Sequence, residues 1–142
     1  MLLVSPEKIA DVMALSPRPK KLADLAQRVA QGLPKDTLKA SAAHIYLNAE
    51  DRNRLIYRII PEATYKRRRE LLTVEESERV ERLARIFASA DFVFDSADDA
   101  RQFLITPHAL LRDRTPLEVS LTELGARQVE DILWRLFYGI ST

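Results

Sequence analysis

The stretch AEDRNRLIYRIIPEATYKRRRE, residues 49–70, contains two short helical patterns separated by a proline. Asn48 precedes the first pattern and is a residue type that favours the start of a helix. Because proline disfavours the helical conformation in the residue before it, we expect the first helix to end just before Pro61. A second helix is then predicted from about Glu62 to Leu71. Two short helices around a tight break, the second of them cationic, have the outline of a helix-turn-helix motif.

The second helix of this motif carries four consecutive cations in a chain whose formal net charge is only +1. On a helix, Thr64, Arg67 and Arg68 share one face, and Tyr65 and Arg69 share another. Arginine reads guanine edges in the major groove and neutralises phosphates, so this helix is a candidate for DNA recognition. The alternative is a solvated helix face, which is favoured by the absence of glycine from the turn. The residues alone leave both interpretations open.

Elsewhere in the chain, apolar residues recur at intervals of three and four, and few stretches alternate with period two. We therefore predict an all-α fold. Two capping signals, Thr73 to Glu76 and Thr115 to Glu118, each predict a helix start with a reciprocal carboxylate, and the helix after Thr73 should be the longest. The last helix should run over 116–140 with a break near 121–122. Further helices are expected from Ser5, over 22–31 with Gly32 at the end, from Pro34 and from Ser96.

The composition of the 142 residues sets limits on the class of protein. No apolar run approaches the roughly 20 residues of a membrane span, and the N-terminal stretch is too short and too acidic for a signal peptide, so we expect a cytoplasmic protein with no membrane partner. The absence of cysteine excludes disulfides and thiolate metal sites. Residues 1–72 hold 14 Lys and Arg against 8 Asp and Glu, a net of +6, whereas residues 73–142 hold 8 against 13, a net of −5. This asymmetry suggests two surfaces with two different tasks.

Residues with catalytic or metal-binding potential are few. His44 and His108 are far apart in the sequence, which argues against a metal site made of several histidines. Acidic pairs such as those at 75–76 and 98–99 stand at predicted helix N-termini, where they complement the helix dipole. The chain has no glycine-rich phosphate loop and no hydrolase motif. We expect no catalytic residue, no metal and no cofactor, so the protein should not be an enzyme.

Three aromatic residues, Trp134, Phe137 and Tyr138, crowd the last predicted helix turns. Aromatic side chains at such a position usually complete a core, and composition favours that interpretation. The alternative is that they anchor a partner protein. The sequence leaves this choice open.

Two segments carry a resemblance to a known family: LTVEESERVERLARIFASADFVF, residues 72–94, and the stretch from Asp95 to Ile140. The most specific motifs are Glu75-Glu76-Ser77, Arg114-Thr115-Pro116-Leu117-Glu118 and Gly125-Ala126-Arg127. With these motifs the chain resembles the antitoxins of the Xre/MbcA/ParS family over about residues 22–142. The similarity is specific in the C-terminal half and looser in the N-terminal half, where IPEATYKRRRELLTVEES matches the recognition helix and its exit.

The resemblance implies an all-α protein in which an Xre-like helix-turn-helix region precedes a toxin-binding domain. Applied to this chain, it implies an N-terminal extension over 1–20, a degenerate helix-turn-helix domain over 21–72 and a toxin-binding and dimerisation domain over 73–142. The implied partner is a RES-domain toxin, which hydrolyses NAD or uses it for ADP-ribosylation. The antitoxin would cover the NAD pocket of that toxin, form a homodimer within a hetero-oligomer, and repress its own operon by binding operator DNA.

The resemblance also implies functional residues. Those at the position of the recognition helix are Thr64, Tyr65, Lys66, Arg67, Arg68 and Arg69. Those expected to contact the toxin are Arg112, Arg114, Trp134, Arg135, Tyr138, Gly139, Ile140, Ser141 and Thr142. A cation near the NAD phosphates and an aromatic ring near a base make chemical sense for a segment that blocks a nucleotide pocket.

Two other functions compete with a toxin-neutralising antitoxin. A dimeric helix-turn-helix transcriptional repressor without a toxin partner would use its C-terminal half only for dimerisation. In that case substitution of Arg67 and Arg68 should abolish function, whereas it should spare neutralisation by an antitoxin. Substitution of Arg114, Trp134 and Tyr138 should then affect stability alone. An enzyme acting on a nucleotide is the third hypothesis, with His108 as the only plausible base.

Overall fold

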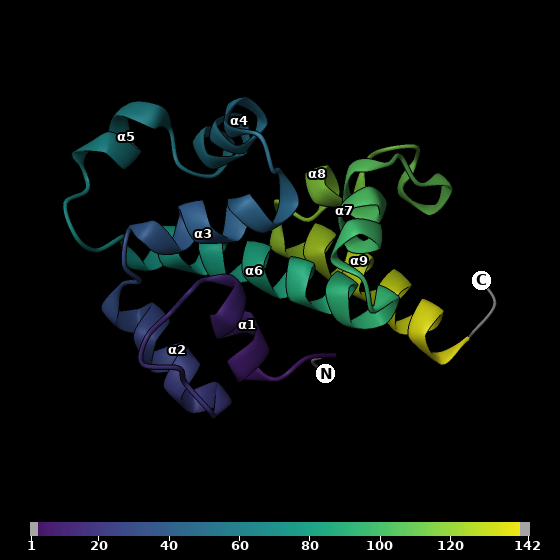
Figure 1. Ribbon diagram of the computed structural model, residues 1–142, viewed down its shortest axis with the longest axis horizontal. Helices are drawn as coiled ribbons and strands as arrows, with labels where there is room; N and C mark the ends of the chain where they lie inside the picture. Colours follow the sequence, from purple (N-terminus) through teal and green to yellow (C-terminus); the bar gives the residue numbers. More distant parts are fainter. Residues whose placement is uncertain (1–2, 140–142) are drawn as a thin grey trace.

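The computed structural model describes residues 3–139, and they form an all-α fold without strands (Figure 1). Helix α6, Val74–Phe94, is the longest element and runs through the centre of the molecule. As predicted, the Thr73 side chain accepts from the Glu76 backbone N–H at its start, and the Glu76 side chain accepts from the Thr73 backbone N–H. One helix thus supports both halves of the chain, because α1, α2 and α3 pack against it as well as α7 and α9.

Three helices precede the predicted helix-turn-helix motif: α1, Pro6–Val12, α2, Leu22–Gln31, and α3, Asp36–Ile45. Ser5 caps α1 as predicted, and Ile9 of α1 and the following Met13 are fully buried in the core. Helix α3 begins at Asp36, slightly later than expected, because Pro34 is engaged in an isolated bridge with Leu71. The segment over 3–20 therefore contributes to the core of the fold.

Gly32 ends α2, as the sequence predicted, in a conformation that only glycine adopts readily. Its φ is +97°, and a Cβ at this position would collide with the backbone oxygen of Leu72. This close approach brings residues 33–35 beside residues 70–72, where Leu72 N donates to Leu33 O at 2.9 Å. The segment that leaves the cationic helix is thereby tied to the start of α3.

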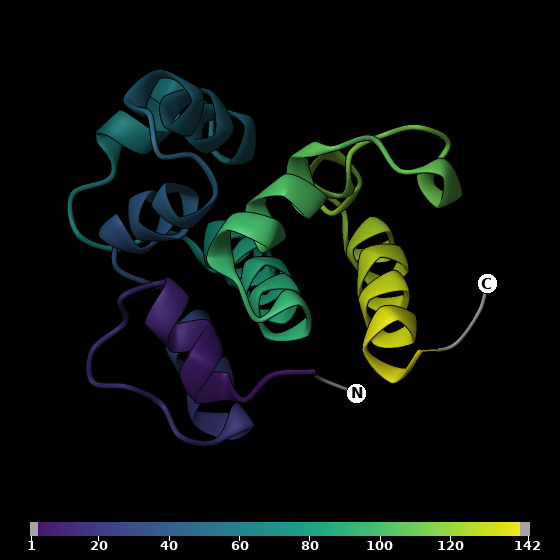
Figure 2. The same ribbon diagram turned by 45° about the vertical axis from the view of Figure 1, so that its right-hand side comes forward.

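The C-terminal half consists of α7, Ala97–Ile105, the 3-10 turn Ala109–Leu111, α8, Pro116–Val119, and α9, Glu123–Tyr138. The predicted break near 121–122 is confirmed. Gly125 makes this break possible because it has no side chain. A Cβ at this position would overlap the carbonyl oxygen of Val119. Figure 2 shows α9 running alongside α6, with the loop between α7 and α8 at the opposite end from the last turn of α9.

The cap of α8 differs from the prediction in one respect. Thr115 accepts from the Glu118 backbone N–H as expected, but the Glu118 side chain does not return to the cap. It forms a two-point ion pair with Arg58 of α4, Ala49–Ile59, at 2.8 and 3.0 Å. The carboxylate thus links the helix-turn-helix region to the C-terminal half instead of completing a capping box.

Candidate nucleic-acid interface and partner surface

The turn of the helix-turn-helix motif forms without glycine. Helix α4, Ala49–Ile59, ends as predicted before Pro61, and its N-terminus is capped by Asn48. Ile60 has a φ of −132° and Pro61 a φ of −51°, so neither residue needs the left-handed conformation that favours glycine. Ile60 is fully buried and fixes the turn to the core. The missing glycine is therefore no argument against the motif.

The cationic helix is shorter than predicted. Helix α5 runs from Glu62 to Arg67 and not to Leu71, so Arg68 and Arg69 are not helical. Arg68 leaves the helix in an extended conformation because its guanidinium forms a two-point ion pair with the largely buried Glu76, at 2.8 and 2.9 Å. The predicted helix face of Thr64, Arg67 and Arg68 is thus wrong for Arg68.

Tyr65 holds α5 against its neighbours. Its ring lies edge-on to Tyr57 of α4 at 6.3 Å, and the ammonium of Lys35 lies over the ring at 4.6 Å. Burial raises the pKa of the Tyr65 phenol. Tyr65 therefore contributes packing, and the residues left to meet an anion are its exposed neighbours.

The remaining cations of the segment differ in their partners. Lys66 pairs with Glu62 one turn earlier, at 2.6 Å. Arg67 and Arg69 are both exposed and, within residues 3–139, make no ion pair; the only side-chain bond of Arg67 goes to the Thr64 hydroxyl at 3.4 Å. Of the six predicted DNA-binding residues, Arg67 and Arg69 are thus the most available to phosphates.

Helix α4 is charged, but its charges lie away from its packed face. Leu55, Ile56 and Ile59 face the core. Arg52 donates to the carbonyl oxygens of Tyr46 and Leu47 at the end of α3. The charges of α4 are therefore compatible with its packing in a helix-turn-helix.

The predicted toxin contacts lie in two separate groups. Arg112 and Arg114 are exposed in the loop before α8, where Arg112 adopts a φ of +56° and Arg114 lies 3.9 Å from Glu118. Trp134, Arg135, Tyr138 and Gly139 lie at the far end of α9. A helix of 16 residues is about 24 Å long, so the structure does not bring the two groups together.

The end of α9 is an exposed aromatic surface and not part of the core. Leu136 is 51% exposed, Phe137 44% and Tyr138 54%. Phe92 of α6, 39% exposed, extends this surface and lies 4.9 Å from the Phe137 ring. The expectation that these aromatics complete a core is wrong, because the buried stripe of α9 ends at Leu133. We call Phe92, Leu136, Phe137 and Tyr138 the aromatic end.

The other predicted contacts adjoin the aromatic end. The half-buried Trp134 packs on the Tyr138 ring at 4.6 Å, and Arg135 pairs with Asp131 at 3.2 Å. Gly139 ends α9 in a left-handed conformation with a φ of +67°. Ile140, Ser141 and Thr142, also predicted to contact the toxin, lie outside the described residues. Sequence analysis did not select Phe92. The available signal was the concentration of aromatic residues near the end of the long predicted helix.

Charged contacts with α6 fix the base of α9. Arg85 lies between Glu81, Glu123 and Glu130, with Arg85 Nη2 3.3 Å from Glu123 and Arg85 Nε 3.6 Å from Glu130. Desolvation dominates the environment of two of these carboxyls and raises the pKa values of Glu81 and Glu130. This cluster orients α9 so that its other end extends away from the helix-turn-helix region (Figure 2).

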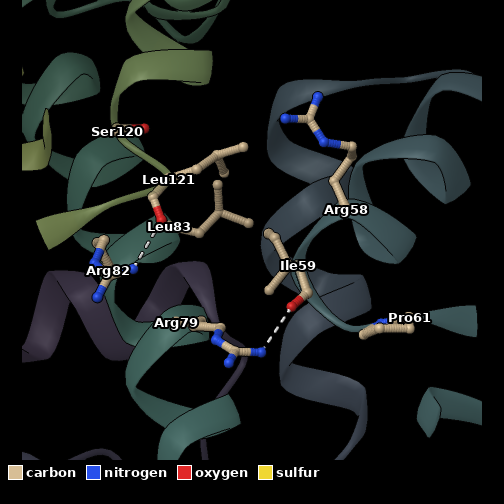
Figure 3. A pocket seen from close by; sticks show the side chains of 8 residues that line it. All are labelled: Arg58, Ile59, Pro61, Arg79, Arg82, Leu83, Ser120 and Leu121. Atoms are coloured by element: carbon tan, nitrogen blue, oxygen red, sulfur yellow. Dashed lines mark hydrogen bonds between the residues drawn. The ribbon is translucent and has the colours of Figure 1, made fainter.

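A cavity of about 290 Å³ lies between the α4–α5 turn and the α8–α9 connection (Figure 3). Three arginines line it: Arg58 from α4 and Arg79 and Arg82 from α6. Sequence analysis selected none of the three as functional residues. For two of them the sequence contains an indication: Arg79 and Arg82 are three residues apart and therefore lie on one face of a helix.

The two histidines have structural environments. The His44 ring lies 5.2 Å from Phe87, and burial lowers the pKa of His44. His108 Nδ1 accepts from the Leu110 backbone N–H at 3.2 Å and so caps the 3-10 turn.

Within residues 3–139, no three His, Cys, Asp or Glu side chains are grouped so as to hold a metal ion. Over the same residues, no helix has the length and apolarity needed to cross a bilayer.

Comparisons with known proteins match both halves of the chain. A family model for the antitoxin Xre-like helix-turn-helix domain matches residues 24–85. A model for the antitoxin Xre/MbcA/ParS C-terminal toxin-binding domain matches residues 89–139. The antitoxin Xre of Pseudomonas putida is 39% identical over an alignment of 84 residues, and the match covers 57% of this chain and 53% of that protein. The match thus spans about half the length of this curated relative. The chain belongs to the Xre/MbcA/ParS family of antitoxins.

Proposed function

We propose that this member of the Xre/MbcA/ParS antitoxin family binds and neutralises a RES-domain toxin, and that the aromatic end of α9 is the principal contact. The observation that carries the proposal is that Leu136, Phe137 and Tyr138 stay exposed at the end of the segment that matches the toxin-binding domain. Clustered aromatic side chains are typical anchors of protein interfaces, and an exposed apolar cluster is costly without a partner.

Inhibition would be steric and would require no catalysis by this chain. Tyr138 and Arg135 lie on the last turns of α9, where an aromatic ring and a cation can approach a nucleotide pocket together. Arg112 and Arg114, at the other end of the C-terminal half, would contact the rim of the toxin. The terminal residues, including Ile140, Ser141 and Thr142, would extend the same contact.

The helix-turn-helix region would bind operator DNA and repress the operon that encodes the chain. Arg67 and Arg69 are the best candidates for phosphate or base contacts, with Lys66 and Thr64 beside them on α5. Operators are usually read by dimers, so we expect a homodimer within a toxin–antitoxin hetero-oligomer that acts in the cytoplasm.

The toxin assignment is tested by NAD loss in the presence of a purified RES-domain toxin encoded beside this chain. The wild-type chain should stop NAD loss at a stoichiometric ratio, and Tyr138→Ala should weaken inhibition at least tenfold. Leu124→Ala, at a 73% exposed site on the first turn of α9, is the matched control and should inhibit normally. If the wild-type chain leaves NAD loss unchanged, the RES-domain assignment is wrong.

The DNA assignment is tested by titrating promoter DNA with the chain at several salt concentrations. Each phosphate contact adds about 0.9 to the slope of log affinity against log salt. Arg67→Ala should lower both affinity and slope without affecting toxin inhibition. A dimeric repressor without a toxin partner would show the DNA behaviour but no effect of Tyr138→Ala in either assay.

A further inference from the structure

The arginine-lined cavity joins the two halves of the protein. One wall is the α4–α5 turn, with Ile59 and Pro61, and the other is the α8–α9 connection, with Ser120 and Leu121. Helix α6 forms the floor through Arg79, Arg82 and Leu83 (Figure 3). The cavity therefore lies beside the start of α5, the predicted DNA-reading helix, and also beside the start of α9.

Backbone carbonyls fix two of the three guanidinium groups. Arg79 Nη1 donates to Ile59 O at 3.2 Å, and Arg82 Nη1 donates to Leu121 O at 3.0 Å. Arg82 Nε is further held by Glu123 at 3.3 Å. Among the described residues, Arg79 Nε and Nη2 and Arg82 Nη2 make no hydrogen bond. Both groups are thus positioned by a neutral acceptor on one side and keep donors for another ligand.

The charge around the cavity is positive. No carboxylate lines it, but Glu118 pairs with Arg58 and Glu123 pairs with Arg82, so these two carboxylates offset part of the positive charge of Arg58 and Arg82. Arg79 makes no ion pair within residues 3–139. A cationic, half-enclosed site with fixed N–H donors favours an anion with several acceptor oxygens.

We propose that this cavity binds a phosphate group through Arg79 and Arg82, with Arg58 at its edge. Arginine suits phosphate because its planar donors can bond two oxygens at once. The phosphate has two possible sources: the DNA backbone beside α5, which rests on the proposed DNA binding, and a free anion such as pyrophosphate, which does not. In either case the ligand touches elements of both halves of the chain.

The first part of the test uses the full chain without DNA. Inorganic phosphate and pyrophosphate are titrated into isotope-labelled protein, and the Nε–H signals of Arg79 and Arg82 are followed by NMR, with sodium chloride at equal ionic strength as reference. A saturable shift that disappears in Arg79→Gln and persists in Arg127→Gln supports the free-anion source. Arg127 is exposed on α9 and is a matched loss of one charge.

The second part measures promoter DNA affinity against salt for the same variants. If a backbone phosphate occupies the cavity, Arg79→Gln lowers the salt slope by about 0.9, whereas Arg127→Gln leaves it unchanged. Arg79→Lys should restore part of the slope, because a cation remains. If the wild-type chain binds no DNA, the proposed operator function fails and the free-anion titration alone decides the cavity. The proposal is overturned if the anions produce no saturable shift and the slope of Arg79→Gln equals that of the wild type.

Discussion

At the α5 end of the molecule, two of the four consecutive cations are held by carboxylates of the same chain, Lys66 by Glu62 and Arg68 by Glu76. At the α9 end, the aromatic and aliphatic side chains of the last turns find few partners inside the fold and remain exposed. The cationic segment thus has fewer unpaired charges than its sequence suggests, and the end of α9 has more exposed apolar surface. A surface that needs a partner is therefore recognised by its unpaired charges or exposed apolar side chains, and not by amino-acid composition alone.

The largest expected effect is a loss of stability that begins at the base of α9. Gly125→Ala places a methyl group against the Val119 carbonyl oxygen, which would force α8 and α9 apart. We expect a loss of about 3 kcal/mol in the free energy of unfolding, at the upper end of the range for overpacking. Urea denaturation measures this loss. An unchanged midpoint would show that α9 does not need this close approach.

The next effect concerns binding and not stability. Phe137→Ala should weaken toxin binding by about 2 kcal/mol, the usual threshold of an interface hot spot, with little change in unfolding. Calorimetric titration with the toxin measures this, and Leu124→Ala is again the matched control. If the Phe137 and Leu124 variants bind alike, the aromatic end is not the anchor.

A smaller effect tests how firmly the cationic segment is held. The Arg68 guanidinium and the Thr73 backbone N–H keep the pKa of Glu76 below its ordinary value. The stabilisation by ionised Glu76 is therefore complete above the ordinary glutamate pKa and is lost as pH falls through the lowered folded value. Glu76→Gln keeps an acceptor for the helix cap but removes the charge paired with Arg68. It should cost about 1 kcal/mol at neutral pH, the upper end for a partly exposed ion pair, and should reduce the loss of stability in acid.

Thermal unfolding at several pH values measures both effects of Glu76→Gln. Glu75→Gln is the neighbouring control, because Glu75 is exposed. Equal acid dependence in the wild type and in Glu76→Gln would contradict the assigned role of this ion pair.

The smallest effect concerns the link between the two regions. Arg58→Gln removes the ion pair with Glu118, which is exposed to solvent and should contribute less than about 1 kcal/mol to stability. If the link only holds the halves together, its loss leaves toxin binding unchanged. A large loss of toxin binding in Arg58→Gln would show that the two regions do not act separately.

Local signals in the sequence were sufficient for most of the fold. The caps at Asn48 and Thr73 and the breaks at Gly32 and Pro61 each depend on residues close together in the chain, and each is found where predicted. The end of α5 was misplaced because Glu76, eight residues after Arg68, removes that arginine from the helix. No helical periodicity contains this information.

The candidate surfaces were harder to predict than the helices. The residues of α9 have a continuous apolar stripe, and the sequence does not reveal that the buried part ends at Leu133. The arginine-lined cavity depends on contacts between residues about 20 and 39 positions apart, which place Arg79 beside Ile59 and Arg82 beside Leu121. Only the tertiary fold brings these groups together.

Whether toxin binding and DNA binding use separate surfaces is tested most directly by two single variants, each assayed for both functions. Arg67→Ala and Tyr138→Ala change one exposed side chain each, and both are measured for toxin neutralisation and for promoter repression in cells. We expect Arg67→Ala to neutralise the toxin but to repress poorly, and Tyr138→Ala to repress without the toxin but to neutralise poorly. Normal neutralisation by Tyr138→Ala would contradict the assignment of the aromatic end as the toxin-binding surface.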